Sequence, residues 1–183
     1  EFTRYKNIVY ALRTQLKKQN MNIRICSQKS GIPYATLYPI IKGQVDIGTC
    51  TYYTVEKLAK VLGYRPDQIV YHKEDFQTFR NNLHHDIKRN DLQTVLGIIE
   101  REDVEYYHMH HDYIKMLYLV ATVDYISKKY SIPLSNKYDE IRKMKLEEPF
   151  FVGDALLLGK KEDAGIKEFA KYNIIEGDLY DAV

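Results

Sequence analysis

The histidines of this sequence gather in two short stretches, His84-His85 and the run HMHHD at residues 108–112. Histidine and aspartate are common metal ligands, and side chains three residues apart lie on one face of a helix. His108 and His111 have that spacing. The run lacks the H-E-x-x-H pattern and any other specific ligand spacing, and a histidine cluster without such a frame is more often polar surface. We therefore expect no metal site and no cofactor.

Asp124 is the other residue whose position suggests chemistry, because it lies inside the otherwise apolar run at residues 114–126. Such a carboxylate is a candidate catalytic group. The simpler interpretation is a structural carboxylate that an Arg, a Tyr or a backbone donor satisfies. The sequence has no Ser/His/Asp, Cys/His or phosphate-loop signature. We therefore expect no catalytic residues and a protein that is not an enzyme.

Charge is distributed unevenly along the 183 residues, although the net charge is only +2. Residues 1–73 hold 12 Lys and Arg against 4 Asp and Glu, a net charge of +8, whereas residues 74–183 hold 15 against 21, a net charge of −6. A compact basic region suits the phosphate backbone of nucleic acid, and an acidic region does not. The asymmetry predicts two domains with different partners, residues 3–73 and residues 74–183.

The composition is that of a globular protein, with 45% hydrophobic and 28% charged residues. The longest apolar stretch, near Met116–Val123, is far shorter than the roughly 20 residues of a membrane-spanning helix. The two cysteines, Cys26 and Cys50, suit a reducing compartment and a chain without a disulfide framework. We expect a cytoplasmic protein with no signal peptide and no membrane partner.

Apolar side chains at helical spacing predict a mainly α protein. In the basic domain, Gly31 supplies the positive φ of a sharp turn, Pro33 suits the first turn of a helix, and Gly43 ends that helix. In the acidic domain, the apolar run at 114–126 predicts a buried central helix. The expected helices span about residues 5–16, 23–30, 33–43, 55–62, 76–83, 90–99, 114–126 and 136–147, with one more near the C-terminus. The expected inner face of the helix at 90–99 consists of Leu92, Val95, Leu96 and Ile99, and short strands are expected at Phe150–Val152 and Leu156–Leu158.

The stretches CSQKSGIPYATLYPIIKG (residues 26–43) and YTVEKLAKVLGY (residues 53–64) resemble the lambda-repressor/Cro-like (Xre-type) helix-turn-helix class. Ser27 matches the small residue at which the two helices touch, and Gly31 matches the turn glycine. Leu37 and Ile40 match the apolar residues that hold the second helix on the first. The resemblance covers about residues 4–70 and implies a DNA-binding bundle of about five helices. The alternative is a small helical bundle that only shares this packing pattern.

In this class the second helix of the motif enters the major groove, and residues near its N-terminus contact base edges. The resemblance therefore implies that the base-reading residues are Tyr34, Ala35, Thr36 and Tyr38. None is an Arg, Gln or Asn, which make the strongest bidentate base contacts, although Thr36 can contact a thymine methyl group. We expect modest direct readout and a strong reliance on phosphate contacts. The expected phosphate-binding residues are Arg24, Gln28, Lys29 and Lys42.

Pro39 stands six residues into the expected base-reading helix. There a proline removes one backbone hydrogen bond and clashes with the carbonyl of Ala35, at a cost of about 3 kcal/mol in a regular helix. Two alternatives follow. The helix continues into a kinked last turn that carries Ile40 and Ile41 into the core, or it ends near Tyr38. Either one leaves the base-reading residues in place.

Four segments of the acidic domain are similar to an uncharacterised region found behind such helix-turn-helix domains in Gram-positive bacteria. They are FRNNLHHDIKRND, YLVATVDYISKKYSIPL, YDEIRKMKLEEPFFVG and FAKYNIIEGDLYDA, at residues 79–91, 118–134, 138–153 and 169–182. The resemblance supports an α-helical second domain in a bacterial regulator, with a role in dimerisation or partner binding. It names no reaction.

These observations together predict a sequence-specific transcriptional regulator that binds double-stranded DNA as a homodimer and acts as a repressor. A specialised version is the antitoxin of a toxin–antitoxin pair, in which the acidic domain binds the toxin as a protein partner. The alternative is a protein-binding inhibitor of a toxin or host nuclease whose helix-turn-helix serves autoregulation. A weaker rival is a metal-dependent nuclease that uses the histidine cluster.

Overall fold

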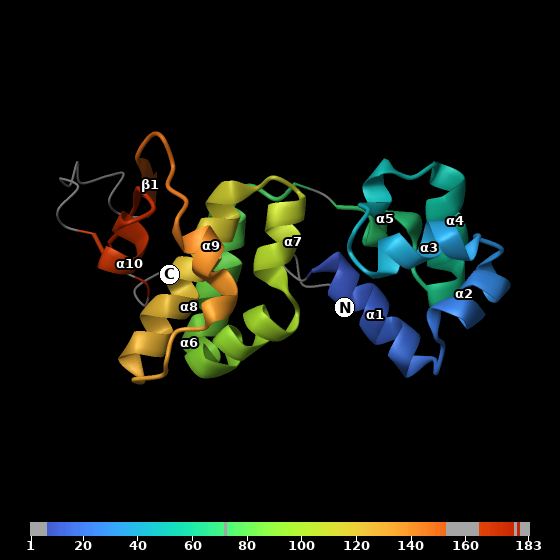
Figure 1. Cartoon of the computed structure of the whole chain (residues 1–183), viewed down its shortest axis with the longest axis horizontal. Coiled ribbons are helices and arrows are strands. Elements are labelled where there is room, and N and C mark those ends of the chain that lie inside the picture. Colours follow the sequence, from blue (N-terminus) through green and yellow to red (C-terminus); the bar gives the residue numbers. More distant parts are fainter. Residues whose placement is uncertain (1–6, 72, 153–164, 178, 180–183) are drawn as a thin grey trace. The chain divides into compact units, whose positions relative to one another are not determined.

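The computed structural model describes residues 7–71, 73–152, 165–177 and 179. The chain divides into two compact units, Glu1–Glu74 and Asp75–Val183, and helices predominate in both (Figure 1). The mainly α fold class expected from the sequence is confirmed.

Short helices that begin at polar caps make up the first unit. They are α1 (Ile8–Lys18), α2 (Ile23–Ser30), α3 (Tyr34–Ile41), the 3-10 turn η1 (Ile47–Thr49), α4 (Tyr52–Leu62) and α5 (Pro66–Ile69). Asn7, Asn22 and Thr51 each accept a hydrogen bond from the backbone N–H three residues later, which satisfies a donor that the helix itself leaves open. The helices end where the chain turns, and Gly31, Gly43 and Gly63 have positive φ there.

The core of the first unit consists of the inner stripes of these helices. Leu12, Leu37 and Leu58 lie at its centre and are almost inaccessible to solvent. The same cluster includes Leu16, Met21, Cys26, Ile32, Ile40, Ile41, Ile47, Val55, Ala59, Leu62 and Ile69. This packing holds α2 against both α3 and α4, and it fixes which face of α3 points outward.

The second unit is built around one buried helix. Its elements are α6 (Phe76–Glu100), α7 (Asp103–Met109), α8 (Tyr113–Lys129), η2 (Asn136–Tyr138), α9 (Asp139–Arg142), β1 (Phe150–Val152), α10 (Lys167–Ala170) and β2 (Ile174–Glu176). Every residue from Lys115 to Asp124 is buried, and α8 packs against α6, α7, α9 and α10. The prediction of a central buried helix at 114–126 is confirmed.

The helix α6 is interrupted at Asn90, whose φ of −165° and ψ of 100° are extended rather than helical. The Asn90 side chain accepts a hydrogen bond from the Gln93 N–H at 3.1 Å, so it acts as the cap of the second half. The predicted inner face of that half is partly wrong. Leu96 is 57% exposed, whereas Val95 and Ile98 are buried, because the packed face is rotated from the predicted one.

A short parallel strand pair lies near the end of the second unit. β1 pairs with β2 in the register Phe150 with Ile174 and Val152 with Glu176. The strand at Phe150–Val152 was expected, whereas β2 falls in the C-terminal stretch where one helix and a tail, but no strand, were predicted. The expected strand at Leu156–Leu158 lies outside the described residues. The expected helix at 136–147 is shorter than predicted, because α9 ends at Arg142.

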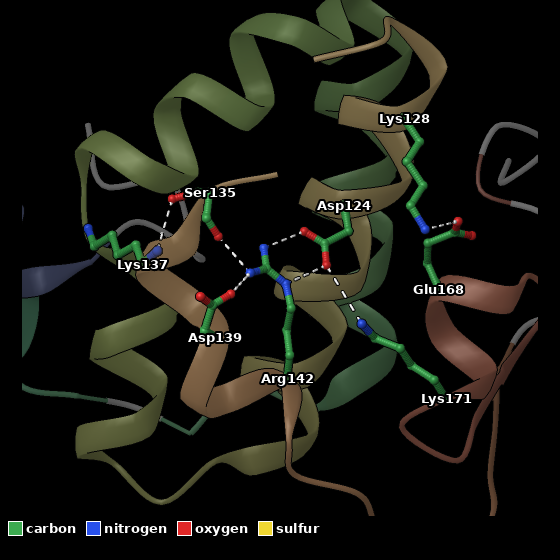
Figure 2. A network of polar contacts seen from close by, with 8 residues as sticks. All are labelled: Asp124, Lys128, Ser135, Lys137, Asp139, Arg142, Glu168 and Lys171. Atoms are coloured by element: carbon green, nitrogen blue, oxygen red, sulfur yellow. Dashed lines mark hydrogen bonds and ion pairs between the residues drawn. The ribbon is translucent and has the colours of Figure 1, made fainter. Parts of the chain in front are cut away.

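Asp124 of α8 forms a structural ion pair rather than an open carboxylate site. Figure 2 shows its carboxylate facing the guanidinium of Arg142. Arg142 Nε lies 2.9 Å from Asp124 Oδ2, and Nη2 lies 2.8 Å from Oδ1. Arg142 Nη1 also donates to the Ser135 carbonyl at 2.6 Å and to Asp139 Oδ1 at 2.8 Å. The interpretation of Asp124 as a structural carboxylate that an Arg, a Tyr or a backbone donor satisfies is confirmed, and Arg142 is the partner.

A second buried ion pair ties α6 to β2. Arg80 Nε and Nη2 each lie 2.9 Å from an oxygen of the Glu176 carboxylate, and both side chains are buried. The Tyr118 hydroxyl donates to Glu176 at 2.6 Å, and His84 Nε2 lies 2.6 Å from that hydroxyl. Because 96 residues separate Arg80 from Glu176, this pair helps to fix the late strand on the helical body.

Candidate nucleic-acid interface

The turn between α2 and α3 is closed by side-chain and backbone hydrogen bonds. Gly31 has φ 73°, and its N–H donates to the Ser27 carbonyl. The Ser27 hydroxyl donates to the Ile32 carbonyl at 2.6 Å, and the Ile32 N–H donates to the Ser30 hydroxyl at 3.2 Å. The buried side chains of Ile32 and Leu37 then anchor the start of α3 in the core.

Pro39 lies inside α3, and the helix continues through it to Ile41. The carbonyl that loses its helical partner is that of Ala35, an exposed residue. Beyond the proline, the Gln44 N–H donates to the Pro39 carbonyl at 2.8 Å, and the Gly43 N–H donates to the Ile40 carbonyl at 3.1 Å. These two bonds are the Schellman pattern that ends a helix at a left-handed glycine.

Arg13 of α1 holds the end of α3. Its Nε donates to the Ile41 carbonyl at 2.9 Å, and its Nη2 donates to the Lys42 carbonyl at 3.0 Å. A guanidinium at this position satisfies carbonyls that a helix leaves open and complements the negative end of the helix dipole. The sequence analysis did not identify Arg13, because 28 residues separate it from Ile41 and nothing local in the sequence connects it to α3.

All four residues expected to read bases lie on the exposed side of α3. Tyr34 is 45% exposed and Tyr38 is 38% exposed, and Ala35 and Thr36 are also exposed. Leu37 stands between them in sequence but points into the core. The four candidates therefore all lie on the outward side of α3, which we call the α3 face.

Two of the four phosphate candidates lie against this face. The Arg24 guanidinium lies 6.0 Å from the centroid of the Tyr34 ring, and Lys42 Nζ lies 5.7 Å from that of Tyr38. The two tyrosine rings are 5.7 Å apart and inclined by 37°. The result is a row of cation, ring, ring and cation across α2 and α3. Such contacts hold long, charged side chains in place at an exposed site.

The other two phosphate candidates, Gln28 and Lys29, are exposed on α2. Within the described residues, no ring contact joins either of them to the α3 face.

Sequence reasoning did not identify a second group of exposed aromatic residues, at the start of α4. Tyr52 is 69% exposed and Tyr53 is 64% exposed, and Lys57 Nζ lies 4.1 Å from the centroid of the Tyr53 ring. A side-chain carbon placed on Gly31 would lie 3.9 Å from Lys57 Nζ, so this group borders the α2–α3 turn. Helical spacing could have revealed these tyrosines, because Val55 and Leu58 define the buried face of α4.

The histidine stretches are engaged in separate local contacts. The His110 ring packs edge-on against Tyr106 with centroids 4.4 Å apart, and His111 Nδ1 lies 2.9 Å from the Tyr113 hydroxyl. Asp112 forms an ion pair with Lys115 at 3.0 Å. Among the described residues, no group of three or more His, Cys, Asp or Glu side chains is arranged to hold a metal ion.

Comparisons with family models, with curated proteins and with solved structures find no match to this chain. Within the described ranges, no helix combines the length and the apolar character needed to cross a membrane.

Proposed function

We propose that this protein is a sequence-specific regulator that binds double-stranded DNA by inserting α3 into the major groove. The proposal rests mainly on one observation, the outward α3 face with Arg24 and Lys42 held beside its tyrosines. An exposed helix with polar and aromatic side chains, fixed at both ends by a glycine turn and flanked by cations, has the features of a groove-reading element. The net charge of +8 on residues 1–73 supports a phosphate-rich ligand.

We further propose that the protein acts in a bacterial cytoplasm as a homodimeric repressor, in which the second unit supplies the dimer contact or binds a toxin. Helix-turn-helix proteins commonly bind paired half-sites, and a two-fold dimer matches that symmetry. A dimer has a mass of about twice the 21.6 kDa of one chain, which light scattering after size-exclusion chromatography measures. A monomer at the concentrations that bind DNA would contradict this part of the proposal.

Selection from DNA tests the central proposal. The full chain is incubated with sheared genomic DNA of the source organism at about physiological salt, and the retained fragments are sequenced. Enrichment of a palindromic site is the expected result. Uniform, weak retention of all fragments would contradict sequence-specific binding.

Variants of the α3 face then test which residues read the site. Tyr34→Ala and Thr36→Ala are each expected to lower affinity for the enriched site by about 1–3 kcal/mol and to relax specificity at one base pair. Lys18→Ala, at the exposed end of α1, is the control and should keep the base preferences of the wild-type protein. Equal losses on the enriched site and on random DNA would remove Tyr34 and Thr36 from the list of base-reading residues.

A further inference from the structure

We propose that the α3 face recognises the 5-methyl groups of thymine, so that the preferred duplex has A·T pairs opposite Tyr34, Ala35, Thr36 and Tyr38. This inference rests on the proposed function and specifies the chemistry that its site would read.

The side chains of the α3 face favour carbon contacts over paired hydrogen bonds. The polar groups among the four residues are three separate hydroxyls. A bidentate contact to guanine or adenine needs two adjacent polar groups in a fixed geometry, as in Arg, Gln or Asn. A lone hydroxyl both donates and accepts, so it discriminates poorly among the base edges. The thymine methyl is the apolar feature that the major groove offers, and it marks one base only.

Apart from three hydroxyls, the side chains of the α3 face are apolar. Tyr34 and Tyr38 lie four residues apart on one line of the helix, with their rings 5.7 Å apart, and Ala35 and Thr36 are exposed farther around its outward side. Tyr34 and Tyr38 are partly covered, with 45% and 38% of their surface exposed, so each has contacts that restrict its orientation. Thymine methyl groups that contact the α3 face would lose contact with water, and this burial of apolar surface favours binding.

The cations border this apolar surface without interrupting it. Arg24 lies beside the Tyr34 ring and Lys42 beside the Tyr38 ring, at opposite ends of the row. The four positions of the α3 face themselves carry no charge. A guanidinium or ammonium group at one of these positions would instead have favoured guanine.

Replacement of thymine by deoxyuridine tests the inference without changing the protein. Deoxyuridine keeps every hydrogen-bonding group of thymine and lacks only the methyl. A duplex is first selected from a random library with the full chain, and each thymine in the selected site is then replaced singly. We expect at least one replacement to weaken binding about fourfold, the effect of one buried methyl-sized group. A deoxyuridine placed outside the site is the matched control and should have no effect.

A further measurement connects the methyl to the α3 face. The sensitive deoxyuridine replacement should cost much less in Tyr34→Ala or Tyr38→Ala than in the wild-type protein, because the carbon contact is already lost.

The outcomes separate this inference from the proposed function. A selected site that tolerates deoxyuridine at every position, or that has no thymine in its central base pairs, would overturn methyl recognition and leave sequence-specific binding intact. Failure of the library to yield any enriched site would overturn both. Deoxyuridine effects that persist unchanged in both tyrosine variants would also overturn the assignment to this face.

Discussion

Arg24 and Lys42 differ from most surface cations of this chain because each lies beside an exposed tyrosine ring of the α3 face. A cation over an aromatic face gains about 0.5–1 kcal/mol at an exposed site. That gain limits the rotamers of the two long side chains before any ligand arrives. If Arg24 and Lys42 contact phosphates, as we propose, they therefore lose less side-chain entropy on binding than freely rotating side chains would.

The charge of Lys42 should affect DNA binding without regard to sequence. In Lys42→Ala, affinity for the selected site and for random duplex should fall by the same factor, and the slope of log K against log salt should become shallower by about 1. Titrations at several salt concentrations measure both quantities. Lys18→Ala removes the same charge from the end of α1 and should leave the slope nearly unchanged. A loss confined to the selected site would mean that Lys42 reads bases.

The Asp124–Arg142 pair should be important for the stability of the second unit. Asp124→Asn keeps the shape of the side chain but leaves the largely buried Arg142 without its main counter-charge, and breaking a buried pair in this way costs about 3–5 kcal/mol. Urea unfolding measures the loss. Glu140→Gln breaks the exposed pair with Lys143 and is the control, with an expected change below about 1 kcal/mol. Similar small losses in both variants would show that hydration replaces the buried pair.

At the scale of elements, α3 is held from both ends by parts of the chain outside it. The Gly31 turn and the buried Ile32 fix its beginning, and Arg13 of α1 together with the Gly43 turn fixes its end. Ordering from outside matters because Pro39 removes one internal hydrogen bond of an eight-residue helix, and so short a helix is marginal alone.

Any side chain at Gly31 should lower the stability of the first unit. Its φ of 73° lies in the left-handed region, so Gly31→Ala is expected to destabilise the first unit by about 1–2 kcal/mol, although no neighbour would clash with the new methyl. Thermal or urea unfolding measures this change. Gly177→Ala is the control, because its φ is not left-handed and its surroundings are open. Equal stability of Gly31→Ala and the wild-type protein would mean that the turn relaxes.

At the scale of the whole molecule, the second unit has buried phenols that should respond to alkali. Tyr138 and Tyr172 are fully buried, and within the described residues their hydroxyls have no hydrogen-bond partner. Burial raises the pKa of both phenols, and the nearby carboxylates of Glu105 and Asp124 raise the pKa of Tyr138 and Tyr172 respectively. Above about pH 10 the unfolded chain releases these protons while the folded unit retains them. The free energy of unfolding should therefore fall as pH rises beyond that value, and not below it.

Tyr172→Phe should reduce the loss of folding stability that occurs at alkaline pH. The variant removes one such phenol, so between pH 8 and pH 11 it should lose about 1.4 kcal/mol less stability than the wild-type protein. At pH 8 its stability should be equal or slightly higher, because an unpartnered buried hydroxyl is removed. Urea unfolding at both pH values provides the comparison. Tyr52→Phe removes an exposed phenol of the first unit and should follow the wild-type profile. A Tyr172→Phe profile identical to the wild type would contradict the pKa argument.

The sequence by itself determined the features that depend on neighbouring residues. Periodic apolar spacing predicted the helical class and the buried α8, and Gly31 and Gly43 marked the two ends of the α3 segment correctly. The four base-reading candidates were also named from the sequence, and all are exposed. Their contact with DNA stays a prediction. These features could be inferred because helix periodicity and turn geometry are set by residues only a few positions apart.

Only the tertiary structure decided the features that join distant residues. It brought Arg24 of α2 to Tyr34 of α3, Arg13 to the end of α3, and Arg142 to Asp124. It also formed β2, whose three residues become a strand because β1 lies beside them as a partner. Leu96 was assigned to the wrong face for the same reason, since the packing of a helix against its neighbours chooses which side is buried. Such contacts depend on the arrangement of whole elements in space, and no local pattern in the sequence encodes that arrangement.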